Sequence, residues 1–231
     1  MATIEVLCPK CSSAVYRHGK AASGEARYRC RGCHHCFQLN YRYEANRPGV
    51  AERIIDMAMN GSGVRDTGRV LKISPTTVVR PFKKLNPAPV NPLPLDTLAL
   101  EHGLELVCEL DEQGSFVGKK SEQRWLWYAW SPHLQCVFAY TFGRRVDKCL
   151  KQLLGLLERF TFRLYCTDDW GAYERLLPED QHLITKRYTQ SIERQNLNLR
   201  THLKRLARKT ICFSRSVEVH DKVVGEYIAR H

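Results

Sequence analysis

The chain has 231 residues, 43% of them hydrophobic, which places it among globular proteins and excludes a disordered tail. Its 36 Lys and Arg residues against 24 Asp and Glu residues give a net charge of +12, which favours a polyanionic partner such as nucleic acid or an anionic membrane. Because no apolar run is long enough to span a bilayer and residues 1–5 lack a signal-peptide pattern, we expect a cytoplasmic protein.

Residues 1–45 carry a cysteine pattern that predicts a zinc ribbon. Two Cys-x-x-Cys knuckles are separated by residues 12–29, a spacing that allows two turns to close a tetrahedral thiolate site. His34, His35 and Cys36 crowd the second knuckle and are alternatives for its last ligand. So small a module gains little from hydrophobic burial, so we expect the metal to be a structural Zn²⁺. The predicted ligands are Cys8, Cys11, Cys30 and Cys33.

Residues 46–86 have the pattern of a helix-turn-helix domain. An amphipathic helix over residues 50–60 is followed by a Gly-Ser-Gly break, and a second helix is predicted over residues 64–71. Ser74 as the N-cap and Pro75 at the first helical position start a third helix. A plain helical hairpin is the alternative, but the turn length and the small residues favour the DNA-binding motif.

The third helix is the predicted recognition helix. Pro81 is expected to end or kink it within about two turns. Its exposed side chains are expected to face a major groove, and the lysines that follow are expected near phosphate. The predicted DNA contacts in this helix are Thr76, Thr77, Arg80, Lys83 and Lys84.

The next segment, residues 87–98, is predicted to be an extended and fairly stiff linker because it is rich in proline. We place the main domain boundary there and expect residues 99–231 to form one α/β domain with a mixed sheet. Strands are predicted over residues 104–110, 124–130, 136–140, 162–167 and 182–185, and helices over residues 146–160 and 192–208. The element order β-β-β-α-β-α-β-α is that of the ribonuclease H-like fold.

Three carboxylates in this domain are candidate ligands for divalent cations. Asp111 and Asp168 are each expected at the end of a strand, as neighbours at the sheet centre, and Glu193 at the start of the long basic helix beside them. Phosphoryl transfer by two Mg²⁺ or Mn²⁺ ions about 3.5 to 4 Å apart needs such a convergence. Most carboxylates are solvated surface groups, so spacing alone is weak evidence.

The basic residues around Glu193 support its assignment as a cation ligand. It is the one acid between Lys186 and Lys209, a stretch that holds eight basic residues. This pattern favours a helix that holds the DNA backbone while contributing one metal ligand, with an ordinary solvated basic helix as the alternative.

Several segments resemble the transposase of the insertion-sequence-one family. They include Glu-Leu-Asp-Glu-Gln at residues 109–113, Thr-Asp-Asp-Trp at residues 167–170, and residues 186–200 and 213–225. Upstream, the cysteine knuckles and residues 54–61 extend the resemblance to nearly the whole chain outside the Pro-rich linker. The sequence departs from the expected pattern at Asp169, where we expect glycine, and at Pro81. Asp169 is therefore an alternative to Asp168 as the ligand.

The resemblance implies a fused, full-length Asp-Asp-Glu transposase of the prokaryotic cytoplasm that is associated with the nucleoid. Its zinc ribbon and helix-turn-helix would bind the terminal inverted repeats of the element as double-stranded DNA, and it would act as a homo-oligomer. Asp111, Asp168 and Glu193 occupy the catalytic positions, and Arg200 falls where such enzymes place a basic residue near substrate phosphate. Lys204 is a further predicted DNA contact in this basic stretch.

In the implied mechanism, water attacks a phosphodiester at the element end and frees a 3′-hydroxyl, which then attacks target DNA. Two other classes of function fit the same motifs. One is a ribonuclease H-like nuclease or resolvase that stops after hydrolysis. The other is a non-catalytic repressor that retains the DNA-binding modules.

Overall fold

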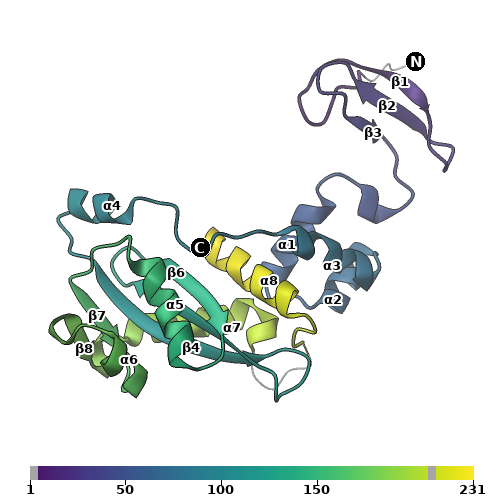
Figure 1. The fold of residues 1–231 in the computed structure, drawn as a ribbon. Helices are drawn as coiled ribbons and strands as arrows, with labels where there is room; N and C mark the ends of the chain where they lie inside the picture. The colour runs from purple at the N-terminus through teal and green to yellow at the C-terminus, as the bar shows by residue number, and fades with distance from the viewer. Residues whose placement is uncertain (1–4, 208–211) are drawn as a thin grey trace.

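A computed structural model describes residues 5–207 and 212–231 of the chain. Figure 1 shows a small N-terminal sheet, a group of three helices, and a larger sheet covered by helices on its two faces. The small sheet stands apart from the rest of the chain, whereas the three helices lie against the C-terminal helix α8.

The N-terminal sheet is antiparallel, in the order β1-β2-β3. Its strands are β1 (Val15–Lys20), β2 (Ala26–Cys30) and β3 (Cys36–Gln38). Among its described residues the buried hydrophobic side chains are Cys8, Cys30 and Phe37, and the ring of Phe37 stacks on that of Tyr28 at 5.9 Å. So little apolar burial cannot by itself hold a sheet together.

The next three helices begin where the sequence predicts, and the first two also end within a residue of the predicted position. They are α1 (Val50–Met59), α2 (Val64–Leu71) and α3 (Pro75–Lys84). Oγ of Ser74 accepts a hydrogen bond from the backbone N–H of Thr77 at 3.2 Å, so Ser74 is the N-cap of α3. Lys72, with a φ of 53°, ends α2 in the left-handed conformation.

Of the expectation that Pro81 ends or kinks α3 within two turns, the ending is wrong, because the helix continues through Pro81 to Lys84. A proline removes the hydrogen bond of its own nitrogen, and one further turn of helix remains after it. Phe82 in that turn is 1% exposed, and its packing holds the end of the helix in place.

The Pro-rich segment attaches to the edge of the larger sheet. The carbonyl of Pro89 accepts from the N–H of Tyr140 at 2.9 Å, and the N–H of Asn91 donates to the carbonyl of Phe138 at 2.8 Å. Helix α4 (Leu95–Glu101) follows, with Leu95 and Ala99 buried, so residues 95–98 of the predicted linker are helical.

The larger sheet has the strand order β6-β5-β4-β7-β8. The pairs β4–β5 and β5–β6 are antiparallel, whereas β4–β7 and β7–β8 are parallel. All five strands predicted for this region are present, in the predicted order along the chain. The strands are β4 (Val107–Phe116), β5 (Gln123–Ser131), β6 (Cys136–Gly143), β7 (Leu164–Thr167) and β8 (His182–Ile184).

The predicted end of the first strand at Asp111 is wrong. Strand β4 continues to Phe116, and Asp111 lies at its middle, paired with Tyr128 of β5. Successive side chains of a strand point to opposite faces, so Glu109, Asp111 and Gln113 share one face. Their polar groups find partners on helix α7, which explains how a central strand tolerates them.

Helices cover both faces of the sheet. Helices α5 (Asp147–Leu157) and α6 (Gly171–Leu176) pack with α4 around one core, whereas α7 (Gln190–His202) and α8 (Val217–Arg230) border the other. The predicted basic helix over residues 192–208 is shorter than expected. Helix α7 ends at His202, a 3₁₀ turn follows at Lys204–Leu206, and residue 208 lies outside the described residues.

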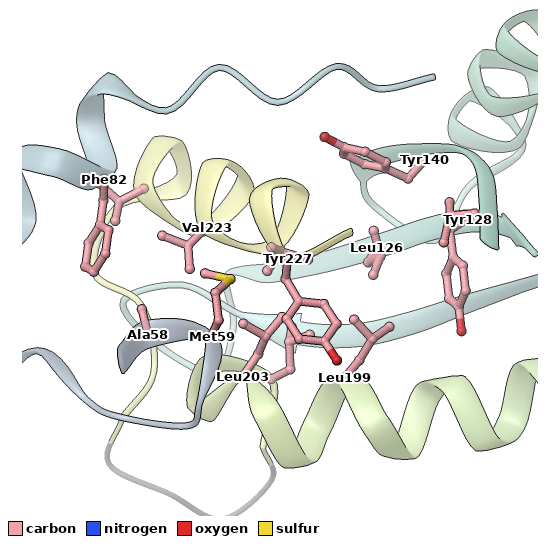
Figure 2. Packing of buried hydrophobic residues seen from close by; sticks show 14 of the residues in the cluster. Ala58, Met59, Phe82, Leu126, Tyr128, Tyr140, Leu199, Leu203, Val223 and Tyr227 are labelled. Carbon is pink, nitrogen blue, oxygen red and sulfur yellow. The ribbon is translucent and has the colours of Figure 1, made fainter. Parts of the chain in front are cut away.

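The second core joins the three-helix group to the larger sheet. Phe82 of α3, Met59 of α1 and Val223 and Tyr227 of α8 belong to the same buried cluster as Leu203 (Figure 2). Polar contacts cross the same boundary. Nζ of Lys222 donates to the carbonyl of Lys83 at 2.6 Å, and Arg230 pairs with Asp56 at 2.9 Å.

We expect Phe82→Ala to destabilise the three-helix group and α8 together. Removing a buried phenyl ring costs about 3–5 kcal/mol in unfolding free energy. Val70→Ala on α2 is the matched control, because Val70 is 66% exposed. Urea unfolding measures the loss, and amide hydrogen exchange locates it. Faster exchange in α1–α3 with unchanged exchange in α8 would contradict a shared core.

Candidate functional site

Four cysteines come together beside the N-terminal sheet. Sγ of Cys11 lies 3.4 Å from Sγ of Cys30 and 3.4 Å from that of Cys33, and Sγ of Cys8 lies 3.6 Å from that of Cys33. Zn–S bonds of about 2.3 Å in a tetrahedron separate sulfurs by about 3.8 Å, so the group has the dimensions of a zinc thiolate site.

Backbone N–H groups point at two of the sulfurs. Those of Lys10 and Gly32 donate to Sγ of Cys8 and Cys30 at 3.4 and 3.3 Å, which stabilises negative charge on sulfur. The side chain of Ser13, and then its backbone, lower the pKa of Cys11 to about 6. At Cys33, by contrast, the backbone hydrogen bond of His35 is outweighed by the neighbouring thiols, which raise the pKa to about 12.

The alternative ligands lie outside this group of four within the described residues. The ring of His35 stacks on Phe37 at 6.0 Å, His34 turns the chain with a φ of 57°, and Cys36 begins β3. The geometry therefore favours Cys33 as the fourth ligand.

A group of carboxylates lies where β4 and β7 run side by side. Asp111, Glu112 and Asp168 each place an oxygen within 4.8 Å of the others. Asp111 comes from the middle of β4, and Asp168 follows the last residue of β7. Parallel pairing of these strands, with Glu109 opposite Cys166, brings the two aspartates together. Carboxylate oxygens at such distances are suitable ligands for a hard divalent cation.

Glu112 belongs to this group but was not among the sequence candidates. Its Oε1 accepts from Nε of Arg145 at 2.6 Å, and its Oε2 accepts from the hydroxyl of Tyr173 at 2.7 Å. The Arg145 guanidinium also lies over the ring of Trp170 at 4.9 Å. Because the negative charge of Glu112 is already paired with the Arg145 guanidinium, Asp111 and Asp168 are the carboxylates better placed to bind a cation.

The structure separates Asp168 from Asp169. Oδ1 of Asp168 accepts from the backbone N–H of Trp170 at 3.1 Å, which holds its side chain at the end of β7. Asp169 is exposed and lies outside the carboxylate group among the described residues. This placement favours Asp168 over Asp169 as a ligand.

Glu193 lies in the first turn of α7, which begins at Gln190, three residues before it. Its exposed carboxylate is not within the 4.8 Å group, but its charge is close enough to raise the pKa of Asp111. The three predicted carboxylates thus lie in one region of the protein. Asp111 and Asp168 are close to each other, and Glu193 is farther away.

Helix α7 is attached to the sheet by polar side chains. Oε2 of Glu109 accepts from the N–H of Ile192 at 2.6 Å, and Nε1 of Trp130 donates to Oγ of Ser191 at 2.8 Å. These contacts satisfy groups at the N-terminal end of the helix, where backbone N–H groups lack partners within the helix. They also fix the turn that carries Glu193.

Burial raises the pKa of Asp111, and the charges of Asp168 and Glu193 add to this effect, while hydrogen bonds from Glu112 and Asn196 oppose it. Burial likewise raises the pKa of Glu109 to about 7. Clustered carboxylates repel one another when ionised, and a bound cation relieves this repulsion. The electrostatics therefore fit a cation site.

The predicted DNA contacts of α3 differ in accessibility. Thr76, Arg80, Lys83 and Lys84 are exposed. Thr77 is half-buried, and its hydroxyl lies 2.9 Å from Oγ of Ser74 and 3.1 Å from the hydroxyl of Tyr43. Tyr43 was missed by sequence reasoning, since a single aromatic residue before the first helix gives no periodic signal.

The two other predicted DNA contacts lie on the C-terminal part of the chain. Arg200 is half-buried on α7 and close enough to Tyr128 to act on the pKa of its hydroxyl. Lys204 is exposed and lines a cavity of about 660 Å³ between α2, α3 and the segment before α8, together with Arg65 and Arg215. This positive lining lies next to the N-terminal end of α3.

Within the described parts of the chain, every helix is too short or too polar to cross a membrane.

Comparison with known families divides the chain into three matched regions. Residues 105–231 match the family described as IS1 transposase. Residues 41–85 match the InsA C-terminal domain, a helix-turn-helix, and residues 1–34 match the InsA N-terminal domain, a zinc ribbon.

Individual relatives agree with this assignment. The insertion element iso-IS1n protein InsB of Shigella dysenteriae is 57% identical over 128 residues, which cover 55% of this chain and 98% of that protein. The insertion element IS1 4 protein InsB of Escherichia coli (strain K12) is 49% identical over 150 residues, which cover 64% of this chain and 86% of that protein.

A zinc ribbon, a helix-turn-helix and a carboxylate-bearing α/β region joined in one chain define a DNA transposase with an Asp-Asp-Glu active site. The chain belongs to the IS1 transposase family. It combines in one polypeptide the regions matched by the InsA domains and by the InsB relatives.

We expect Cys11→Ser to release the zinc-ribbon metal and to abolish specific DNA binding, because the N-terminal sheet has almost no core of its own. Cys36→Ser is the control, since Cys36 is exposed and outside the group of four. Zinc content and gel shift measure the outcome, and circular dichroism reports on the remaining fold. A Cys11→Ser protein that retains one equivalent of zinc and normal binding would exclude the predicted site.

Proposed function

We propose that this transposase binds the terminal inverted repeats of its element through residues 1–45 and 46–86 and cleaves and joins DNA strands with residues 99–231. The observation that carries this proposal is the convergence of Asp111 and Asp168 beside the basic helix that bears Glu193. A polyanionic substrate needs both features at once, since carboxylates hold the cations and basic side chains hold the phosphates.

A ribonuclease H-like fold is our assignment for residues 99–231. Its support is the topology, in which three antiparallel strands are extended on one side by two parallel strands. In this arrangement β4 and β7, the first and fourth strands along the chain, are neighbours at the centre of the sheet. Asp111 lies on β4, and Asp168 directly follows β7.

Mg²⁺ or Mn²⁺, bound as a pair, would lower the pKa of an attacking water or hydroxyl and neutralise charge at the scissile phosphate. Asp111, Asp168 and Glu193 are the residues that would hold these ions. Half-buried Asp111 and the fixed first turn of α7 restrict where the ligands lie, and such positioning contributes to catalysis by orientation. The N-terminal cysteines would hold a separate structural Zn²⁺.

Two displacements at phosphorus complete the proposed reaction. In the first, a water oxygen bonds to phosphorus, the bond from phosphorus to the 3′ oxygen breaks, and a 3′-hydroxyl is released at the element end. In the second, this hydroxyl bonds to a target phosphorus and displaces the target 3′ oxygen. Arg200 and Lys204 are proposed to hold backbone phosphates during both steps. Because an element has two ends, we infer that the protein acts as a homo-oligomer on DNA.

The proposed carboxylate roles predict loss of chemistry without loss of recognition. Asp111→Asn, Asp168→Asn and Glu193→Gln each remove one anionic ligand at nearly constant shape, so we expect cleavage and strand transfer in Mg²⁺ to fall on the order of 10³-fold. End binding should remain near normal, since the helix-turn-helix lies against α8 and not against these carboxylates.

Asp169→Asn is the matched control for Asp168→Asn and should keep most activity. Nicking and joining of an end-containing plasmid measure the chemistry, and gel shift measures the binding. Joining by all three variants in Mg²⁺ or Mn²⁺ would refute the carboxylate mechanism. Hydrolysis without joining by the parent protein would instead indicate a nuclease.

The recognition helix makes a second prediction. Arg80→Ala should reduce discrimination between element ends and random DNA, because an exposed arginine on this helix can read base edges. Lys84→Ala should weaken both kinds of binding alike and lower the salt slope by about 1. Binding is measured at several salt concentrations on both DNAs. Equal effects of the two substitutions would argue against this docking of α3.

A further inference from the structure

Asn196 is buried between α7 and the sheet, with 8% of its surface exposed. Its Nδ2 donates to Oδ2 of Asp111, and its Oδ1 lies 3.1 Å from the hydroxyl of Tyr128. The carbonyl of Asn196 accepts from Nε2 of Gln113 at 3.1 Å. One residue thus ties α7 to β4 and β5 at the level of Asp111.

The direction of these hydrogen bonds is fixed by chemistry. The NH₂ group of Asn196 must face Asp111, because an inverted amide would set an oxygen against a carboxylate oxygen. The amide oxygen then faces Tyr128, whose hydroxyl donates to it or to the carbonyl of Ile192 at 3.2 Å.

Asp111 is held at each of its oxygens. Oδ1 accepts from the backbone N–H of Glu112 at 2.7 Å, and Oδ2 accepts from Asn196. A carboxylate oxygen has two lone pairs, so each oxygen keeps one for a cation. Hydrogen bonding of this kind orients metal ligands, and its loss typically costs about 10–100-fold in metal affinity or activity.

Asn196 also lies three residues after Glu193 on α7, which is about one helical turn. The side chains of both residues therefore project from the same side of the helix. The hydrogen bond from Asn196 to Asp111 thus sets the position of the helix segment that carries Glu193 relative to β4. A change at Asn196 disturbs one ligand directly and a second through the helix.

We propose that Asn196, oriented by Tyr128, is the positioning residue that holds Asp111 and Glu193 in register for cation binding. This inference rests on the proposed function of the carboxylates. The side-chain amide of Asn196 is engaged by Asp111 and Tyr128, so its role is positional. Its role is to present a preformed carboxylate pair, which lowers the cost of assembling the site when a cation arrives.

The test measures cation binding directly, with the full chain in its zinc-loaded form. Free Mn²⁺ is followed by electron paramagnetic resonance during titration, and end binding is followed by gel shift. We expect Asn196→Ala to weaken Mn²⁺ binding about 10-fold or more with normal end binding. Asn198→Ala is the matched control, because Asn198 is an exposed asparagine on the same helix. It should bind Mn²⁺ as the parent protein does.

A second variant keeps the proposal testable if Asn196→Ala does not fold. Tyr128→Phe removes one hydroxyl from a fully buried ring and with it one of the contacts that orient the amide of Asn196, so Mn²⁺ binding should weaken by a smaller factor, roughly 3-fold. Folded Asn196→Ala and Tyr128→Phe proteins that both bind Mn²⁺ like the parent would overturn the inference.

Asp111→Asn distinguishes this outcome from failure of the proposed function. If Asp111→Asn abolishes Mn²⁺ binding while Asn196→Ala leaves it unchanged, the cation site stands and the positioning role is wrong. If Asp111→Asn also leaves Mn²⁺ binding unchanged, the proposed site itself is wrong, and the positioning role with it.

Discussion

Strand β4 has two different faces, and the geometry of the carboxylate region depends on this difference. Leu110 on one face lies in the core shared with α5 and α6, whereas Glu109, Asp111 and Gln113 on the other make hydrogen bonds to α7. Buried polar groups are tolerated where they have partners and costly where they do not. Helix α7 therefore docks in one register, since sliding it would remove the donors to Oε2 of Glu109 and Oδ2 of Asp111. Packing of apolar side chains alone would allow more freedom.

The sequence was most informative where a signal is local. Ser74 followed by Pro75 marked the start of α3, and the cysteine spacing marked the four residues that come together near β2. The sequence predicted that β4 ends at Asp111, because a charged residue after an apolar run usually marks the end of a strand. The residue that satisfies Asp111 inside the strand is Asn196, which lies far along the chain. Glu112 was missed for the same reason. Its partners Arg145 and Tyr173 are brought to it by the sheet, and no spacing in the sequence reports such a contact.

Sequence reasoning also placed a boundary in the Pro-rich segment but did not foresee what that segment does. The prolines correctly excluded a helix at the start of the segment. Extended backbone also leaves carbonyls free to pair with a sheet edge, and the carbonyl of Pro89 accepts a hydrogen bond from the N–H of Tyr140. Helix α8 was not among the helices predicted from the sequence. That helix supplies Val223 and Tyr227 to the core beneath α1 and α3.

The seating of the three-helix group on α8 has a geometric consequence for DNA. A domain on a free tether samples many positions, so the distance between the base pairs it reads and a remote catalytic centre varies with tether length. Here the tether is hydrogen-bonded to β6 and the helices share buried side chains with α8. In the proposed reaction, the number of base pairs between the recognised sequence and the cleaved phosphodiester would therefore be set by the width of the folded body, and lengthening the Pro-rich segment would leave that number unchanged.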